Sequence, residues 1–203
     1  VHGTPVIIGF FMAGMLSGAA IPPIWYFILA ALVGFLFKSA GSVHNELSDL
    51  DMDAPDPILR KKPIQAGIIS RSEARSYMGA CLISGAALGL VAFPPATAGI
   101  VLLAAGLIFV YNAAGKYVPV AYEMLFPASM ALLVLGGAFL AGGPGRETAV
   151  LAFTIFCANI FAQWLDGGRD VGTDRAAGVA SRPALCAGTP GGRASTAASG
   201  AVI

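Results

Sequence analysis

Three long stretches of the sequence carry no charged residue, and they restrict the chain to one kind of fold. Residues 1–37, 76–115 and 148–165 contain no Asp, Glu, Lys or Arg. A helix needs roughly 20 apolar residues to cross the hydrocarbon core of a bilayer. Backbone groups inside that core must be hydrogen-bonded within the segment, so these stretches are expected to be helices. The mean hydropathy of +0.77 is also typical of a membrane protein.

Proline and glycine divide the apolar sequence into six predicted membrane-spanning helices. Helix-breaking residues occur at Pro22-Pro23, at Pro94-Pro95, around Pro119 and in the turn 142–145. The predicted spans are 4–20, 23–43, 77–93, 97–113, 119–141 and 147–165. The sequence therefore predicts an all-α, polytopic transmembrane helical bundle in a lipid bilayer.

Most of the charged residues lie in two segments, 38–75 and 166–182, where acids and bases are mixed. The formal net charge is only +1, so no basic surface for a nucleic acid is expected. Lys and Arg flank the even-to-odd connections and the end of the sixth span, and basic residues tend to stay on the cytoplasmic side. We therefore expect an integral protein of a prokaryotic cell membrane, with these loops facing the cytoplasm.

The first charged segment contains a stripe of oxygen ligands. Asn45, Asp49 and Asp53 are spaced i, i+4, i+8, which places them along one side of a helix, whereas Asp51 falls on the other side. Neighbouring carboxylates repel one another unless a cation lies between them. Oxygen ligands without His or Cys suit Mg²⁺, and the basic residues that follow, Arg60, Lys61 and Lys62, would add positive charge for a diphosphate. A solvated loop with balanced charges is the alternative for this segment alone.

The second charged segment repeats the same spacing. Asp166, Asp170 and Asp174 follow the last predicted span, with Arg169 and Arg175 between them. Because both stripes follow an even-numbered span, they are expected on the same side of the membrane. The repeat favours two metal sites or one shared diphosphate cage over two loops that serve solubility alone.

These motifs resemble those of the UbiA-type intramembrane prenyltransferase family. Its Asn-Asp-x-x-Asp-x-x-x-Asp motif is similar to Asn45, Glu46, Asp49 and Asp53, with Glu in place of the first Asp. Its second motif, Asp-x-x-x-Asp-x-x-x-Asp, matches the stripe that begins at Asp166. Two further segments of the family resemble residues 62–67, with Lys for Arg at the first position, and the Tyr111 to Lys116 stretch.

The resemblance implies Mg²⁺-dependent transfer of a prenyl group from a polyprenyl diphosphate donor to an acceptor, often aromatic or otherwise lipophilic. The residues implied as metal ligands are Asn45, Asp49, Asp53, Asp166, Asp170 and Asp174. Those implied in diphosphate binding are Arg60, Lys62, Lys116 and Arg169. The implied catalytic set is Asp49, Asp53, Asp166, Asp170, Lys116 and Tyr111.

The family has nine helices, and only six are predicted in this chain. We therefore expect a partial prenyltransferase domain over 1–178 and a low-complexity tail over 179–203, disordered, truncated or frame-shifted. An inactive fragment is one alternative to the active enzyme. The others are a CDP-alcohol phosphotransferase-like enzyme, whose Asp-Gly-x-x-Ala-Arg pattern is absent, and a cation transporter, which would carry acids within its spans.

Several aromatic residues have a second interpretation as an interfacial belt. Trp25, Tyr26, Tyr117 and Tyr122 lie near the ends of predicted spans, where aromatic rings are often found at the membrane surface. Tyr111 is open to the same interpretation. The acceptor and the length of the donor chain stay open at this point.

Overall fold

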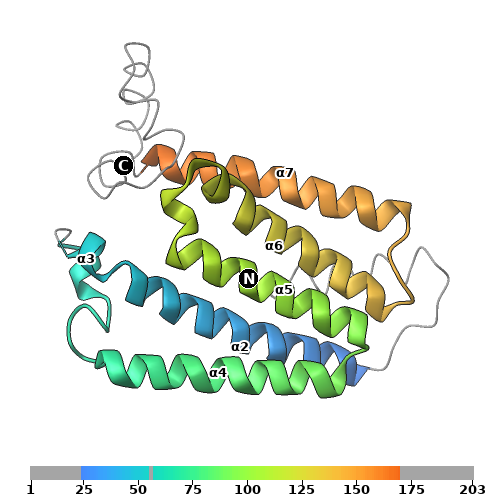
Figure 1. Cartoon of the computed structure of the whole chain (residues 1–203), viewed down its shortest axis with the longest axis horizontal. Helices are drawn as coiled ribbons and strands as arrows, with labels where there is room; N and C mark the ends of the chain where they lie inside the picture. The colour runs from blue at the N-terminus through green and yellow to red at the C-terminus, as the bar shows by residue number, and fades with distance from the viewer. Residues whose placement is uncertain (1–23, 55–56, 170–203) are drawn as a thin grey trace, which may run out of the picture.

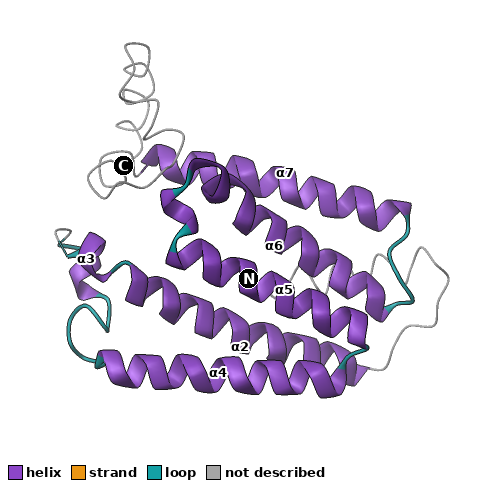
Figure 2. Ribbon diagram, in the orientation of Figure 1, coloured by secondary structure: helices purple, strands orange, loops and turns teal. Residues whose placement is uncertain are grey.

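The computed structural model describes residues 24–54 and 57–169, and every regular element in these ranges is helical. Figure 1 shows the helices side by side along one common direction, and Figure 2 shows the loops that join them. The long helices are α2 (Ile24–Ser48), α4 (Arg71–Ala92), α5 (Pro95–Ala113), α6 (Pro119–Leu140) and α7 (Arg146–Arg169). The short ones are α3 (Leu50–Asp53) and the 3-10 helices η1 (Leu59–Lys61) and η2 (Gly115–Tyr117). The predicted all-α fold is confirmed.

The five long helices are long and apolar enough to cross a membrane. They correspond to the second to sixth predicted spans, and the predicted span 4–20 lies outside the described residues. One boundary differs clearly, because α4 begins at Arg71 rather than near residue 77. Its start is fixed by a capping box in which Ser70 Oγ accepts from the Glu73 N–H at 3.2 Å and Glu73 Oε2 accepts from the Ser70 N–H at 2.9 Å.

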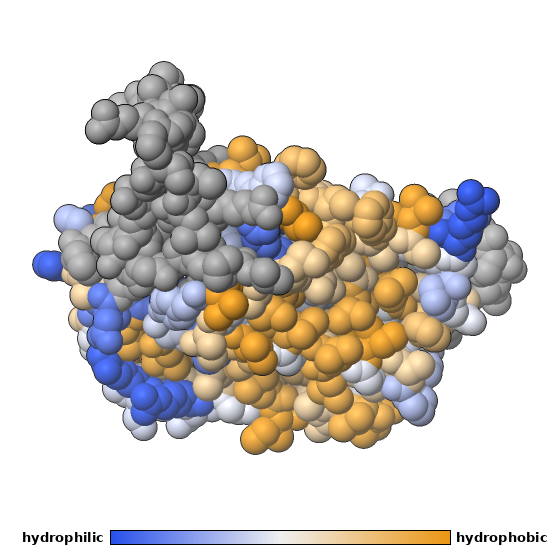
Figure 3. Space-filling view, turned by 45° about the horizontal axis from the view of Figure 1, so that its top comes forward, coloured by the Kyte–Doolittle hydropathy of each residue, from blue (hydrophilic) through white to orange (hydrophobic). Residues whose placement is uncertain are grey.

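The long helices pack in the spatial order α4, α2, α5, α6, α7. α6 buries the largest share of its apolar segment, 44%, so it is the most enclosed of the five. Large apolar side chains such as Phe35, Ile83 and Phe153 are instead 61–73% exposed. In Figure 3 such side chains form a broad hydrophobic band, with hydrophilic residues toward the two ends of the molecule. This distribution suits a bundle whose outer surface faces lipid.

Small residues and a few polar side chains bring the helices into close contact. A Cβ atom added at Gly85 of α4 would lie 3.3 Å from Leu36 Cβ of α2. Thr97 Oγ1 of α5 donates to the Gly136 carbonyl oxygen of α6 at 3.2 Å. The buried Asn112 Nδ2 of α5 donates to the Gly41 carbonyl oxygen of α2, also at 3.2 Å. These contacts fix α2, α5 and α6 around a common interior.

Replacing Gly85 by Leu is expected to destabilise the bundle by about 1–3 kcal/mol, because the new side chain would push α2 and α4 apart. The matched control is Gly79→Leu on the same helix, since a Cβ atom there would meet nothing within 4 Å. The control gains helix propensity and is expected to keep or raise the unfolding temperature. Thermal unfolding of both variants in detergent checks this, and equal unfolding temperatures would show that the α2–α4 contact at Gly85 is not tight.

Candidate functional site

A cavity of about 380 Å³ lies among α2, α5 and α6 and extends to the loop after η1. On α2 its lining residues recur every three or four positions from Ala30 to Glu46, so one side of this helix forms a wall. Val101, Ala105, Ile108, Phe109, Tyr111 and Asn112 line it from α5, and Phe126 and Leu133 from α6.

The cavity is elongated and its two ends differ in polarity. At about 1.5 Å per residue, Ala30 and Glu46 are about 24 Å apart along α2. Near Ala30 the walls are apolar and include Phe93 and Leu133. Toward Glu46 they become polar, and the lining there includes Lys38, Ser42, Asn45, Glu46, Lys62 and Asn112. The shape suits a long apolar molecule with a polar or charged head.

The first predicted motif lies at this polar end. α2 ends at Ser48 and α3 begins at Leu50, but the Asp49 N–H donates to the Asn45 carbonyl oxygen at 3.0 Å. The Asp53 N–H likewise donates to the Asp49 carbonyl oxygen at 2.8 Å, so the helical spacing continues through the bend. Asp49 and Asp53 are buried, at 6% and 4% exposure, whereas Asp51 is exposed. This is the distribution that the i, i+4, i+8 spacing predicts.

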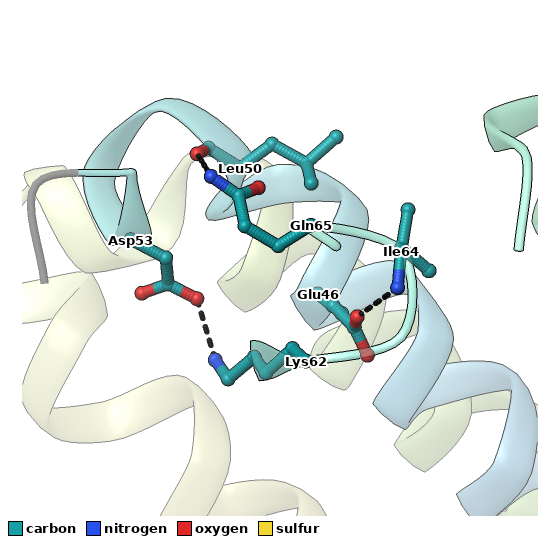
Figure 4. Close-up of polar contacts among 6 residues, drawn as sticks. All are labelled: Glu46, Leu50, Asp53, Lys62, Ile64 and Gln65. Atoms are coloured by element: carbon teal, nitrogen blue, oxygen red, sulfur yellow. Dashed lines mark hydrogen bonds and ion pairs between the residues drawn. The ribbon is translucent and has the colours of Figure 1, made fainter. Parts of the chain in front are cut away.

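The loop after η1 places Lys62 beside these acids. Lys62 Nζ forms an ion pair with Asp53 Oδ2 at 2.5 Å (Figure 4). The Lys62 side chain also lines the cavity. Arg60 is exposed, and its Nε donates to the Ala54 carbonyl oxygen. Arg60 is not among the residues that line the cavity, so only one member of the basic triplet reaches it.

Glu46 occupies the position at which the UbiA-type motif has Asp, and its side chain contacts the backbone of the same loop. Its Oε1 accepts from the Ile64 N–H at 2.9 Å, as Figure 4 shows. Gln65 Nε2 donates to the Leu50 carbonyl oxygen at 2.9 Å. The Ile64 side chain is buried with Leu50 and Ala74. The loop is therefore held by polar and apolar contacts together.

Aromatic rings form part of the cavity wall. Tyr111 lines the cavity, with its ring centroid 6.0 Å from those of both Tyr122 and Phe126. His44 stacks on Phe109, with ring centroids 4.5 Å apart.

Tyr122 is only 7% exposed, so its interpretation as an interfacial belt residue is wrong. The Tyr122 ring packs against Tyr111 of α5 and is buried between the two helices. The sequence shows only that Tyr122 lies near the end of a span.

The remaining predicted site residues lie at the same end of the molecule or outside the described ranges. Lys116 belongs to η2, and Asp166 and Arg169 to the end of α7, where only the backbone is described. Figure 1 places η2 and the end of α7 at the same end of the bundle as α3. Asp170 and Asp174 lie outside the described residues.

The described side chains of the first motif fit Mg²⁺ in chemistry. Asn45 at the cavity wall and the buried Asp49 and Asp53 are hard oxygen donors one helical turn apart. Within 24–54 and 57–169, no group of three or more His, Cys, Asp or Glu side chains is arranged to hold a metal ion. The role of Asn45, Asp49 and Asp53 as metal ligands stays a prediction.

Three polar residues of the cavity were missed in the sequence. Lys38, Ser42 and Asn112 line it, and Lys38 Nζ donates to Ser42 Oγ at 3.5 Å. Lys38, Ser42 and Asn45 are spaced i, i+4, i+7, so the first stripe extends back into the predicted span. That spacing was a usable signal. Asn112 has none, because its position depends on how α5 packs against α2.

Comparison with known proteins identifies the family of this chain. The sequence model of the UbiA prenyltransferase family matches residues 6–203. The chain belongs to this family. Five helices able to span a bilayer, together with membership of the UbiA family, make it an integral membrane protein. The family assignment favours the prenyltransferase prediction over the phosphotransferase and transporter alternatives.

Two curated UbiA-family relatives are similar in sequence. A digeranylgeranylglyceryl phosphate synthase from Methanoculleus marisnigri is 30% identical over 91% of this chain and 63% of its own length. A 4-hydroxybenzoate octaprenyltransferase from Idiomarina loihiensis is 31% identical over 72% of this chain and 50% of its own length. The chain thus spans between half and two thirds of the length of these relatives.

Two solved UbiA homologues share the fold. One from Archaeoglobus fulgidus, bound to DMAPP and Mg²⁺, has a TM-score of 0.77 at 21% identity over 96% of this chain and 67% of its own. An apo structure from Aeropyrum pernix K1 has a TM-score of 0.71 at 22% identity, over 98% of this chain and 74% of its own. At this identity the likeness concerns the fold alone.

Proposed function

We propose that the protein transfers a prenyl group from a polyprenyl diphosphate to a lipophilic acceptor within the membrane, in an Mg²⁺-dependent reaction. The observation that carries this proposal is the elongated cavity, apolar near Ala30 and polar near Asn45 and Lys62. A polyprenyl diphosphate has the same division into a long apolar chain and an anionic head. The names of the relatives and the DMAPP and Mg²⁺ in a solved homologue support the same chemistry.

In the proposed reaction the bond between the allylic carbon and the diphosphate oxygen breaks, and the electron pair leaves with the diphosphate. The acceptor then forms a bond to the allylic carbon and releases a proton. The apolar walls exclude water, which would otherwise capture the cationic carbon. The ring of Tyr111, in contact with Phe126, offers an aromatic surface that tolerates positive charge.

The two acidic motifs and the basic residues would act on the diphosphate. Mg²⁺, when bound, would neutralise the charge that develops on the leaving oxygens. Its proposed ligands are Asn45, Asp49, Asp53, Asp166, Asp170 and Asp174. Lys62, which lies at the cavity wall beside Asp53, would also bind the diphosphate. Lys116, Arg60 and Arg169 are proposed to assist from the same end of the bundle.

We further propose that this end faces the cytoplasm of a prokaryotic cell. The α2–α4 loop, η2 and the end of α7 lie at this end, and they carry five of the nine Lys and Arg residues in the described ranges. The opposite end has Arg146 beside Glu147. A prenyl donor made in the cytoplasm would then reach the polar end of the cavity directly.

The proposed function is tested with membranes that carry the protein, labelled geranylgeranyl diphosphate and Mg²⁺. The acceptors to be compared are 4-hydroxybenzoate, other hydroxylated aromatics and a prenylated glycerol phosphate. We expect diphosphate release and a labelled lipophilic product with at least one acceptor, and loss of both with EDTA. The absence of diphosphate release with every acceptor, from protein shown to be folded, would overturn the proposal.

A further inference from the structure

The loop segment 62–67 is attached to α2 and α3 at consecutive residues. The Ile64 N–H donates to Glu46 Oε1, and Gln65 Nε2 donates to the Leu50 carbonyl oxygen, both at 2.9 Å. The Ile64 side chain is 8% exposed and packs with Leu50. Figure 4 shows these contacts on one side of the segment, with Lys62 reaching Asp53 just before them.

The contact from Glu46 serves a backbone group that its own segment leaves without a local partner. Within the segment, the Ala66 N–H bonds to the Lys62 carbonyl oxygen and the Gly67 N–H to the Ile64 carbonyl oxygen, at 2.8 and 3.1 Å. The Ile64 N–H instead bonds to a residue 18 positions earlier in the chain. A buried backbone N–H needs a partner, and a carboxylate is a strong acceptor.

Lys62 lies only two residues before this contact. Lys62 has an extended backbone, with φ −57° and ψ 141°, as expected for a residue before proline. Pro63 has a nearly fixed φ, so few torsions separate Lys62 from the tethered Ile64. The Lys62 side chain then reaches both the cavity and Asp53 Oδ2, at 2.5 Å.

We infer that Glu46 is a positioning residue: its carboxylate holds the backbone of the loop at Ile64 and thereby places Lys62 at the polar end of the cavity. Glu46 itself also lines the cavity, so the competing role is that of a metal ligand. Glu is one methylene longer than the Asp of the UbiA-type motif, and this length lets the carboxylate reach the Ile64 N–H. The catalytic consequence of this inference rests on the proposed function. The hydrogen bond from Ile64 to Glu46, called the tether below, does not depend on it.

Hydrogen exchange of the protein in detergent tests the tether without any substrate. In Glu46→Ala we expect the Ile64 amide to exchange about tenfold faster or more, because its acceptor is lost. Glu46→Gln keeps an acceptor oxygen at the same reach and is expected to change exchange least. Glu46→Asp, which is shorter, should be intermediate. Peptides from α5 serve as the internal control for global unfolding. Unchanged exchange at Ile64 in Glu46→Ala would overturn the inference.

Kinetic measurements on the same variants then distinguish a positioning role from a metal-binding role, because the two roles predict a different order of activity among the variants. If Glu46 positions Lys62, Gln is tolerated better than Asp, the KM for the donor rises about tenfold in Glu46→Ala, and the Mg²⁺ requirement stays the same. If Glu46 is a metal ligand, Asp is tolerated better than Gln and the Mg²⁺ requirement rises; this order would also overturn the inference. A wild-type protein that transfers no prenyl group contradicts the proposed function, while the exchange result still decides the tether.

Discussion

Replacing Asp49 by Asn is expected to lower kcat for prenyl transfer by about 10²–10³-fold, in the range seen when a group that stabilises developing charge is removed. Asp49 is 6% exposed and lies one helical turn from both Asn45 and Asp53. Asn keeps the size of the side chain but removes the charge that a divalent cation needs. The measurement is the rate of diphosphate release at saturating donor over a range of Mg²⁺ concentrations.

The matched control is Asp51→Asn, two residues away on α3, where the side chain is exposed. This change also removes one negative charge from the segment, but on the opposite side of the helical turn. We expect kcat within about twofold of the wild type, since exposed charges contribute little. Equal losses in both variants would mean that the overall negative charge of this segment matters, and that the stripe defined by Asn45 and Asp49 does not.

The positions of the five long helices are well predicted from the sequence, because each helix depends on the composition of its own segment. Long uncharged stretches between prolines gave the second to sixth spans close to where α2, α4, α5, α6 and α7 lie. The start of α4 was missed although its signal is local, since Ser70 and Glu73 form a capping box in charged sequence outside the apolar stretch. Hydropathy alone does not register such a signal.

The candidate site was predictable only as far as it follows the spacing along one helix. The buried positions of Asp49 and Asp53 and the exposure of Asp51 follow from the period of the helix. The contact between Asn112 and the Gly41 carbonyl oxygen joins residues 71 positions apart, so it depends on which helices pack together. The link from Glu46 to Ile64 depends on the path of a loop, which no periodic pattern encodes.

Replacing Ala105 by Phe is expected to shorten the usable length of the cavity and so to change which donors are accepted. Ala105 lines the cavity from α5, seven residues before Asn112 at the polar end, which corresponds to about 10 Å along the helix. A short donor such as dimethylallyl diphosphate would still fit between these positions, whereas the chain of geranylgeranyl diphosphate would meet the new ring. We expect the ratio of kcat/KM for the long donor to that for the short donor to fall about a hundredfold.

The matched control is Leu103→Phe on the same helix, because Leu103 is 54% exposed and is not among the residues that line the cavity. It adds a ring to the lipid-facing side and should leave the donor ratio unchanged. Thermal unfolding of both variants separates a blocked cavity from a damaged bundle, since overpacking at Ala105 would lower stability as well. A folded Ala105→Phe protein with an unchanged donor ratio would show that the prenyl chain does not run along α5, and the cavity would then have to hold the acceptor.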